Sequence, residues 1–399
     1  MNAWFVPRRL AYMAVTGCVC LLGVAVASAG PGVTVTSTTA APLSGSWRRL
    51  PPAPIAPGLG AVSVWTGTEM IAFGRAHPKP PWSVDVAAAY SPATDTWRRL
   101  SPFSGEPGNY EGHYSAVWTG KEMLVFGPAD GQAFNPLTNR WRRLPRSLPA
   151  EFALGLVVWT GREAIAWGGG CCGDASSTGW AYDPATGKVH KVARSPLAPS
   201  QGPTGAWTGR ELIVFVSGLD PDGEPYPASF ARAAAYNPAT STWRRIAPLP
   251  VPRDRPAVVW DGHDVLVVGG TITSRKAPWR LARIGFAFNP TTNRWRRLAP
   301  MDSGRASFAA VWAGTRLLIW GGTTTPGGGV REVVPQSPPG GFAYTPATNR
   351  WSTLPRAPLR GRLDPTAVWT GRAMIVWGGL AANIYRGFAD GAAFTPAAR

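Results

Sequence analysis

Three arginines share one position in a repeated sequence, and their chemistry suits an anion-binding site. Arg253, Arg305 and Arg362 each stand seven residues before a tryptophan that recurs along the chain, and Glu111 takes the same position in another copy. A guanidinium group stays charged at physiological pH and donates forked hydrogen bonds to a carboxylate or sulfate. If this position rings the mouth of a central channel, the three groups converge. We therefore predict that an anion, a carboxylated sugar or an acidic peptide binds there.

The alternative role for these arginines is structural. They would then form salt bridges with Glu111 or with acidic residues close to them in sequence. Those acidic residues are Asp254, Asp302 and Asp364. A cation that is already paired within the protein offers little to a ligand, so the two roles exclude one another.

Two tryptophans stand outside the repeat and could bind a flat ligand. Trp82 and Trp279 lie in long insertions, whereas most of the 20 tryptophans occupy repeated positions. An exposed indole stacks on a sugar ring or another flat apolar face. The alternative is that each indole folds down and caps its own loop. We predict that both residues contribute to ligand binding.

Two adjacent cysteines, Cys171 and Cys172, lie in a glycine-rich loop. Their Cα atoms are ~3.8 Å apart across a trans peptide, which is below the usual separation in a disulfide. We predict a disulfide between them, which would be strained and would stiffen the loop; two free thiols or an intermolecular bond are the alternatives. No second cysteine pair or nearby histidine completes a structural zinc site. We expect neither a metal nor a cofactor.

All of these residues are positioned by a unit of four short strands that recurs seven times. The clearest copy, residues 308–354, reads FAAVWAGTRLLIWGG, a loop, and GFAYTPATNRWSTL. A tryptophan ends the first strand of each copy: Trp65, Trp118, Trp159, Trp207, Trp260, Trp312 and Trp369. Another marks the fourth strand: Trp47, Trp97, Trp141, Trp243, Trp295 and Trp351, with Val189 there once. Periods of 41 to 57 residues built from four strands indicate β-propeller blades.

The two ends of the repeat complement each other. The seventh copy ends after its third strand at Phe394, whereas residues 46–50 read as a fourth strand with no copy before it. Pairing the two closes the ring and removes an exposed strand edge. We predict an all-β, seven-bladed β-propeller of four-stranded antiparallel blades over residues 45–399, closed by the N-terminal strand, which completes the last blade.

The unit resembles the kelch repeat of the galactose oxidase and kelch-like superfamily, in an exported bacterial type. The resemblance rests on the recurring aromatics and on glycine pairs after the second strand: Gly168-Gly169, Gly269-Gly270, Gly321-Gly322 and Gly378-Gly379. It implies the propeller fold and little about activity, because function resides in sites. Galactose oxidase-like and sialic acid mutarotase-like enzymes are similar propellers. The copper ligands of the former, two histidines and two tyrosines, have no matching set here, because the four histidines stand at different repeat positions.

The first 29 residues have the pattern of an export signal. Arg8 and Arg9 precede an apolar run over residues 10–26, and Ala27-Ser28-Ala29 fits a small-residue cleavage site. An uncleaved membrane span and a lipoprotein-type cleavage at Cys18 are the alternatives. Residues 30–44, rich in Thr, Ser, Pro and Ala, are expected to be a flexible linker. The propeller is therefore expected outside the cytoplasm, extracellular or associated with the cell envelope.

Basic residues recur beside the fourth-strand tryptophan, in a chain of formal net charge +18. The pairs are Arg48-Arg49, Arg98-Arg99, Arg142-Arg143, Arg244-Arg245 and Arg296-Arg297. The fourth strand is the outer edge of a blade, so these pairs would form a basic girdle. The girdle either protects the strand edges by charge or attaches to an anionic envelope polymer. Nucleic acid is not an expected partner of an exported protein.

Length variation is concentrated between the second and third strands, whose loops emerge on the same face as the connections between blades. Loops on a rigid scaffold are where binding usually takes place. We therefore predict a binding or interaction module whose ligand, a glycan or a protein, lies on this long-loop face. The alternative is a carbohydrate-active enzyme with its site at the channel mouth.

Overall fold

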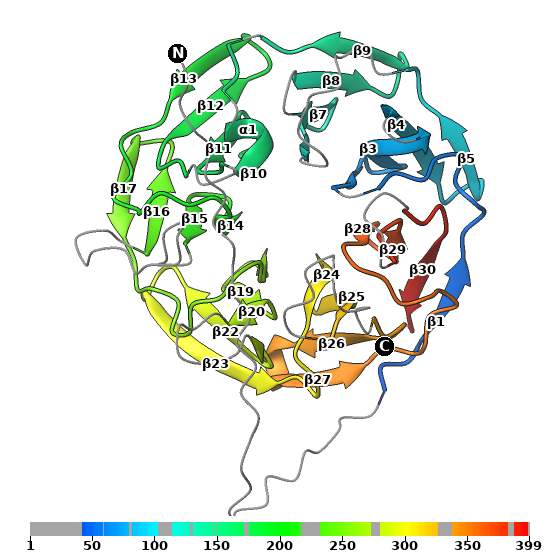
Figure 1. Cartoon of the computed structure of the whole chain (residues 1–399). Coiled ribbons are helices and arrows are strands. Elements are labelled where there is room, and N and C mark those ends of the chain that lie inside the picture. Colours follow the sequence, from blue (N-terminus) through cyan, green and yellow to red (C-terminus); the bar gives the residue numbers. More distant parts are fainter. Residues whose placement is uncertain are drawn as a thin grey trace, which may run out of the picture. The chain divides into compact units, whose positions relative to one another are not determined.

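In a computed structural model of this chain, each repeat of the sequence forms a four-stranded antiparallel sheet, and seven such sheets form a β-propeller (Figure 1). The chain divides into two compact units, residues 1–38 and 39–399. The structure describes, all within the second unit, residues 42–58, 60–79, 82–102, 114–127, 131–145, 147–149, 151–170, 175–216, 232–272, 280–325, 337–381 and 387–397.

The first four blades follow one another along the chain. Blade 1 comprises β2 (Val62–Trp65), β3 (Met70–Lys79), β4 (Trp82–Ser91) and β5 (Thr96–Arg99). Blade 2 comprises β6 (Ser115–Trp118), β7 (Met123–Phe126), β8 (Gly131–Asn135) and β9 (Arg140–Arg143). Blade 3 comprises β10 (Leu156–Trp159), β11 (Ala164–Trp167), β12 (Gly179–Asp183) and β13 (Lys188–Lys191), preceded by the short helix α1 (Glu151–Leu154). Blade 4 comprises β14 (Thr204–Trp207), β15 (Leu212–Phe215), β16 (Ala233–Asn237) and β17 (Thr242–Arg245).

The last three blades have longer strands or additions. Blade 5 comprises β18 (Ala257–Trp260), β19 (Val265–Val268), β22 (Ile284–Asn289) and β23 (Arg294–Pro300), with a two-stranded ribbon of β20 (Thr271–Ile272) and β21 (Arg280–Leu281). Blade 6 comprises β24 (Ala306–Trp312), β25 (Leu317–Thr323), β26 (Gly341–Thr345) and β27 (Arg350–Thr353), with the 3₁₀ turn η1 (Pro346–Thr348). Blade 7 comprises β28 (Thr366–Trp369), β29 (Met374–Trp377), β30 (Gly391–Pro396) and β1 (Gly45–Arg49).

The N-terminal strand completes the last blade, which confirms the predicted closure. Strand β1 pairs antiparallel with β30, and Trp47 lies opposite Phe394. In Figure 1 the dark blue β1 lies along the outside of the red β30. The first strand of every blade contacts the first strands of both neighbouring blades, so the contacts run around the whole ring.

The core lies between the blades. The second strands are buried along their length, and Trp167, Trp320 and Trp377 are fully buried in them. Apolar residues of each blade pack against those of the next, and seven clusters result, one at each blade interface. A continuous apolar run is what a strand covered on both faces requires, so the sequence pattern and the packing agree. Within the described residues, no helix has the length and hydropathy needed to cross a lipid bilayer.

The fourth-strand tryptophans also bond one blade to the next. Each indole donates its N–H to a backbone carbonyl at or just after the end of the fourth strand of the preceding blade, at 2.9 or 3.0 Å. The bonds are Trp47 to Pro355, Trp97 to Pro51, Trp141 to Ser101, Trp243 to Ala193, Trp295 to Ala247 and Trp351 to Ala299. These tryptophans therefore supply both apolar packing and a directed hydrogen bond across the interface.

Candidate functional site

The three arginines predicted to bind an anion are buried in three separate blades. Each is 5% exposed or less. Arg305 donates from Nη1 to the carbonyl oxygens of Gly321 and Gly340, both at 2.8 Å. Arg253 does the same in blade 5 with Gly269 and Ile284, at 3.2 and 2.9 Å. The guanidinium groups thus cap the backbone where strands two and three part.

Arg362 occupies the equivalent place in blade 7. Its Nη1 donates to the carbonyl oxygen of Gly378 at 3.0 Å and to a side-chain oxygen of Asp390 at 2.7 Å. The guanidinium group lies 4.1 Å from the ring centre of Phe388. Its partner is therefore Asp390 and not Asp364, whose carboxyl group is hydrogen-bonded to Ser307.

Burial makes these guanidinium groups easier to deprotonate. It lowers the pKa of Arg253 and of Arg305 to about 10, and it also lowers the pKa of Arg362. All three remain protonated at neutral pH. Each group donates hydrogen bonds to carbonyls of its own blade. Anion binding by these arginines stays a prediction.

The other predicted site residues fall largely outside the described part of the chain. Glu111, Trp279, Cys171 and Cys172 are among the residues that the structure does not describe. The backbone of Trp82 begins β4 and lies opposite Lys79 in β3, but the position of its side chain is not described. Their ligand and disulfide roles stay predictions.

The basic girdle is largely paired within the protein. In four of the five pairs the first arginine reaches the acidic residue in the turn between strands one and two of its own blade. In the fifth, Arg48 pairs with Asp95 in the β4–β5 turn of blade 1. Arg98 meets Glu69, Arg142 meets Glu122 and Arg244 meets Glu211, each with two nearly parallel hydrogen bonds of 2.6–3.1 Å. Arg296 pairs with Asp264 at 3.0 Å. These arginines therefore contribute less free positive charge than the sequence suggests.

These same arginines also contact the next blade. Arg48 and Arg296 donate to the hydroxyl groups of Tyr90 and Tyr344, at 2.8 and 3.1 Å. Where the next blade has phenylalanine in that position, Arg244 donates instead to the carbonyl of Pro290 at 3.2 Å. The girdle thus joins adjacent blades as well as strand edges.

The short turns form a surface that we call the turn face: the turns between strands one and two and those between strands three and four of every blade. Two hollows open on it, with volumes of about 580 and 460 Å³. The first lies between blades 2 and 3 and the second between blades 4 and 5. We call them groove 2/3 and groove 4/5.

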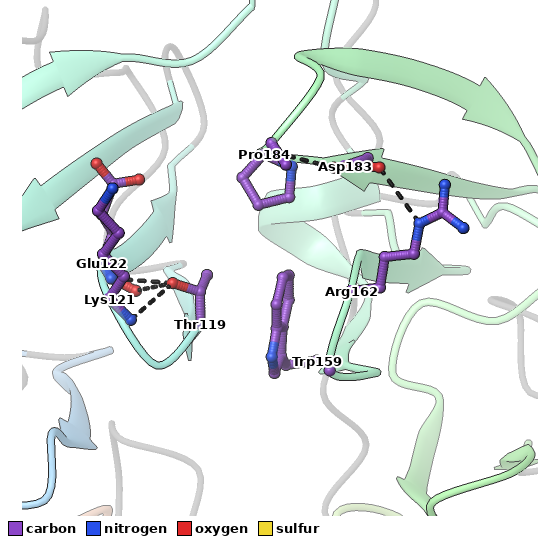
Figure 2. Close-up of a pocket in the computed structure, with 9 residues that line it drawn as sticks. Thr119, Lys121, Glu122, Trp159, Arg162, Asp183 and Pro184 are labelled. Atoms are coloured by element: carbon purple, nitrogen blue, oxygen red, sulfur yellow. Dashed lines mark hydrogen bonds and ion pairs between the residues drawn. The ribbon is translucent and has the colours of Figure 1, made fainter.

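Groove 2/3 has one charged wall and one mixed wall (Figure 2). Thr119, Lys121 and Glu122 come from the β6–β7 turn, and Trp159, at the end of β10, stands between that turn and Arg162. The remaining wall is the β12–β13 turn with Pro184. The Thr119 hydroxyl accepts a hydrogen bond from the Glu122 amide at 2.9 Å and so fixes the first turn.

Asp183 anchors the opposite wall of groove 2/3. Burial disfavours its ionised form, but hydrogen bonds from the amides of Ala185 and Thr186 and from Arg162 outweigh this effect, and the pKa of Asp183 is lowered. The carboxylate is therefore ionised at neutral pH and bonded to its own turn. Arg162, at 3.4 Å from it, remains largely exposed.

Groove 4/5 repeats this arrangement two blades further on. Thr208, Arg210 and Glu211 replace Thr119, Lys121 and Glu122; Trp260 replaces Trp159, and Pro290 and Thr291 replace Pro184 and Ala185. The repeat positions that carry both grooves are visible in the sequence. The sequence does not distinguish them, because a first-strand tryptophan that only packs between blades and one that also lines a hollow stand at the same repeat position.

The comparisons with known proteins concern short stretches. A kelch motif model matches residues 252–302, which span blade 5 from Arg253 to the end of β23. Alpha-scruin of Limulus polyphemus is 31% identical over 107 residues, which are 26% of this chain and 11% of alpha-scruin. Kelch-like protein terF of Aspergillus terreus is 27% identical over 151 residues, 38% of this chain and 31% of terF. The chain thus matches a minor part of the length of each of these relatives.

One similar solved structure is a fungal alcohol oxidase of the AA5 family in complex with copper. It matches with a TM-score of 0.67 at 14% identity over 88% of this chain and 76% of the oxidase chain, a likeness of fold alone. The described residues do not fit such a metal. Among them, no three or more His, Cys, Asp or Glu side chains lie together so that they could hold a metal ion. His190 and His263 lie in blades 3 and 5, beside Glu163 and Asp264 of their own blades.

The fold and the motif match both indicate a propeller built from one repeated blade. The kelch motif covers one complete blade, and the other six blades repeat its strand order and, apart from Val189 in blade 3, its aromatic positions. The chain is a seven-bladed β-propeller whose fifth blade matches the kelch motif.

Proposed function

We propose that this propeller is a binding module that holds a protein partner on its turn face. The observation that carries the proposal is the repetition of one groove at two blade interfaces, with an indole, a proline and charged side chains in the same places. Grooves of this kind, on an interface of fixed geometry, offer apolar contact with a few oriented polar groups. The kelch motif in blade 5 and the similarity to a kelch-like protein support the same class of function, a protein-binding module.

Rigidity favours binding on this face. The turns that line the grooves are short, and their backbone is held by hydrogen bonds from the Glu122 and Glu211 amides to the hydroxyl groups of Thr119 and Thr208. The apolar clusters lie directly beneath them, at the blade interfaces. A partner therefore meets preformed walls and loses little affinity to ordering them.

The long-loop face is the second surface considered, because the sequence predicts a glycan or protein ligand there. Most of its loops lie outside the described residues. The proposed module acts outside the cytoplasm, which rests on the export-signal pattern of residues 1–29. An anionic envelope polymer on the girdle is a weaker candidate, because the first arginines of the girdle are already paired.

A photo-crosslinking experiment tests this proposal and separates the two faces. Leu137, in the β8–β9 turn, is 90% exposed on the turn face, and Val84, in β4, is 46% exposed near the β3–β4 loop. A photoreactive residue is placed at either position, and the exported and surface proteins of the source organism are offered to each variant. We expect a protein adduct at position 137 and a weak one or none at position 84.

Each other outcome has a defined meaning. An adduct at position 84 alone would place the partner on the long-loop face and contradict the turn-face assignment. If neither position yields a protein adduct while the protein binds glycans on an array, the partner is a glycan and the proposed protein-binding function is wrong. A variant carrying the photoreactive residue but kept in the dark controls for non-covalent capture.

A further inference from the structure

Each groove is lined by a basic residue, and the glutamate that follows this residue in the sequence is already bound to another arginine. Lys121 precedes Glu122, and Arg210 precedes Glu211, in turns of the same type. Arg142 holds Glu122 with bonds of 3.1 and 2.6 Å, and Arg244 holds Glu211 with bonds of 2.9 and 2.7 Å. A carboxylate bound in this forked way has little capacity left for a second cation. Lys121 and Arg210 therefore keep most of their charge for a ligand.

Both cations are accessible. Their side chains are exposed, and the described part of the structure records no hydrogen bond from either of them to a carboxylate. Arg210 acts on Glu211 only through space, and Arg244 is the first cause of the lowered pKa of Glu211. The surplus charge at each groove is thus positive, in a chain whose formal net charge is +18.

The wall beside each cation is apolar. Trp159 and Pro184 line groove 2/3, and Trp260 and Pro290 line groove 4/5. Both indoles are half-buried, so each keeps an exposed part toward its groove. Figure 2 shows Trp159 and Pro184 next to each other, across the hollow from Lys121 and Glu122. A ligand that fills such a groove needs an apolar group beside an anionic one.

We propose that the two grooves bind extended acidic segments of a protein partner, with a carboxylate at Lys121 or Arg210 and an apolar side chain against the indole and proline. This inference rests on the proposed protein-binding function and names the chemistry of the partner. Peptides supply carboxylates and apolar side chains in adjacent positions, and each groove is lined by a cation together with an indole and a proline. A sugar hydroxyl both donates and accepts, so a protein that binds a sugar must offer acceptors as well as donors. The carboxylates of both grooves, the natural acceptors, are already bound to arginines.

Two equivalent grooves on one rigid ring have a further consequence. A partner with two acidic segments, or two copies of one, could occupy both grooves at once. The second contact would then be intramolecular and would strengthen binding without any new chemistry. The long-range attraction of an acidic partner by a strongly basic chain raises the rate of association and weakens at high salt.

Fluorescence anisotropy with defined peptides tests this inference on the full chain. The probe is a labelled peptide of repeating Glu, Leu and Pro, and its control carries Gln in place of Glu. The test variant is Lys121→Gln with Arg210→Gln. Its matched control is Arg356→Gln with Arg372→Gln, which removes the same charge from two exposed arginines that do not line either groove.

We expect the acidic peptide to bind the natural protein and the Gln peptide to bind it far more weakly. The groove variant should bind the acidic peptide about fivefold to twentyfold more weakly, the combined loss of two partly solvated ion pairs, whereas the control variant should keep its affinity. Equal losses in the two variants would show that net charge alone attracts the peptide, and the groove assignment would be wrong.

Two further results separate this inference from the proposed function. If the groove variant still yields the protein adduct at position 137, the propeller binds a protein but not through these grooves. If polygalacturonate binds with a loss in the groove variant and the acidic peptide does not bind at all, the grooves hold an acidic glycan and the peptide inference is overturned. Circular dichroism of each variant confirms that the fold is unchanged.

Discussion

At the scale of single residues, arginine has two roles in this molecule. Arg253, Arg305 and Arg362 are desolvated and bond to backbone carbonyls of their own blades. The fourth-strand arginines, such as Arg142 and Arg244, remain partly exposed and pair with carboxylates of the turn face. The first role stabilises the place where two strands part, and the second links strands and blades. Lys121 and Arg210, by contrast, are exposed and form no salt bridge to a carboxylate among the described residues.

The buried arginines are predicted to contribute to stability. Replacing Arg305 by Met removes the guanidinium donor from the carbonyl oxygens of Gly321 and Gly340, and the Gly340 oxygen keeps only the longer bond, 3.3 Å, from the Gly321 amide. We expect the free energy of unfolding to fall by about 1–3 kcal/mol, the usual penalty for an unsatisfied buried polar group. Chemical denaturation measures the effect, and Arg356→Met, at an exposed position, is the control. Unchanged stability would show that these guanidinium groups are dispensable for the fold and would favour their predicted ligand role.

The Arg244–Glu211 pair predicts a dependence of stability on pH. The hydrogen bond from Arg244 lowers the pKa of Glu211 below its ordinary value of 4.5, against the effect of burial. The pair therefore stabilises the fold fully above that ordinary pKa, and the contribution is lost as the pH falls through the lowered value. Between pH 6 and strongly acidic pH (about 2), the Glu211→Gln variant should lose less free energy of unfolding than the natural protein. Identical curves would contradict this role for the pair.

At the scale of elements, the blade is a unit that is completed by its neighbour. Its second strand is buried by the blades on both sides, and its fourth-strand indole bonds to the backbone that follows the preceding fourth strand. Blade 3 has Val189 where the others have tryptophan, so the interface between blades 2 and 3 lacks this bond. The same interface carries groove 2/3, the larger of the two grooves.

The hydrogen bond of a fourth-strand indole can be removed while an aromatic side chain is kept at that position. In Trp295→Phe the aromatic packing is largely kept, and the carbonyl oxygen of Ala247 loses its donor. We expect a loss of about 1 kcal/mol in the free energy of unfolding, measured by urea denaturation. Trp65→Phe is the control, since the described structure records no hydrogen bond from that indole. Equal effects of the two substitutions would mean that packing alone explains the tryptophan repeat.

At the scale of the whole molecule, stability depends on closure. The contacts between first strands run around the entire ring, and β1 fills the last position in blade 7. An open ring would expose the edge of β30 and the cluster that Trp47 helps to cover. An uncovered strand edge pairs readily with other chains.

Deleting residues 45–51 should therefore open the propeller. We expect a broadened, less cooperative thermal transition and aggregation, measured by circular dichroism and light scattering. Adding a peptide of residues 42–51 in trans should restore part of the cooperativity, because the edge of β30 remains available to it. A deletion variant with the melting behaviour of the natural protein would contradict the closure argument.

The repeat pattern is sufficient to derive the fold. Alternating and continuous apolar runs identify the strands, the spacing of Trp and glycine pairs identifies the blade, and the unmatched strand at residues 46–50 identifies the closure. These features are local or periodic. They predict the burial of apolar strands and the pairing of strand edges without information on contacts elsewhere in the chain.

The tertiary structure alone decides which charges are free. Arg305 looks available in the sequence because its partners are backbone carbonyls, and every residue carries a backbone carbonyl. The grooves likewise form where two blades meet, so that Lys121 and Pro184, distant in the chain, line one hollow. The sequence by itself determined the ring and its repeated positions. Which of those positions are buried and paired, and which stay exposed, was decided by desolvation and by contacts between blades, because both depend on neighbours that the linear order does not reveal.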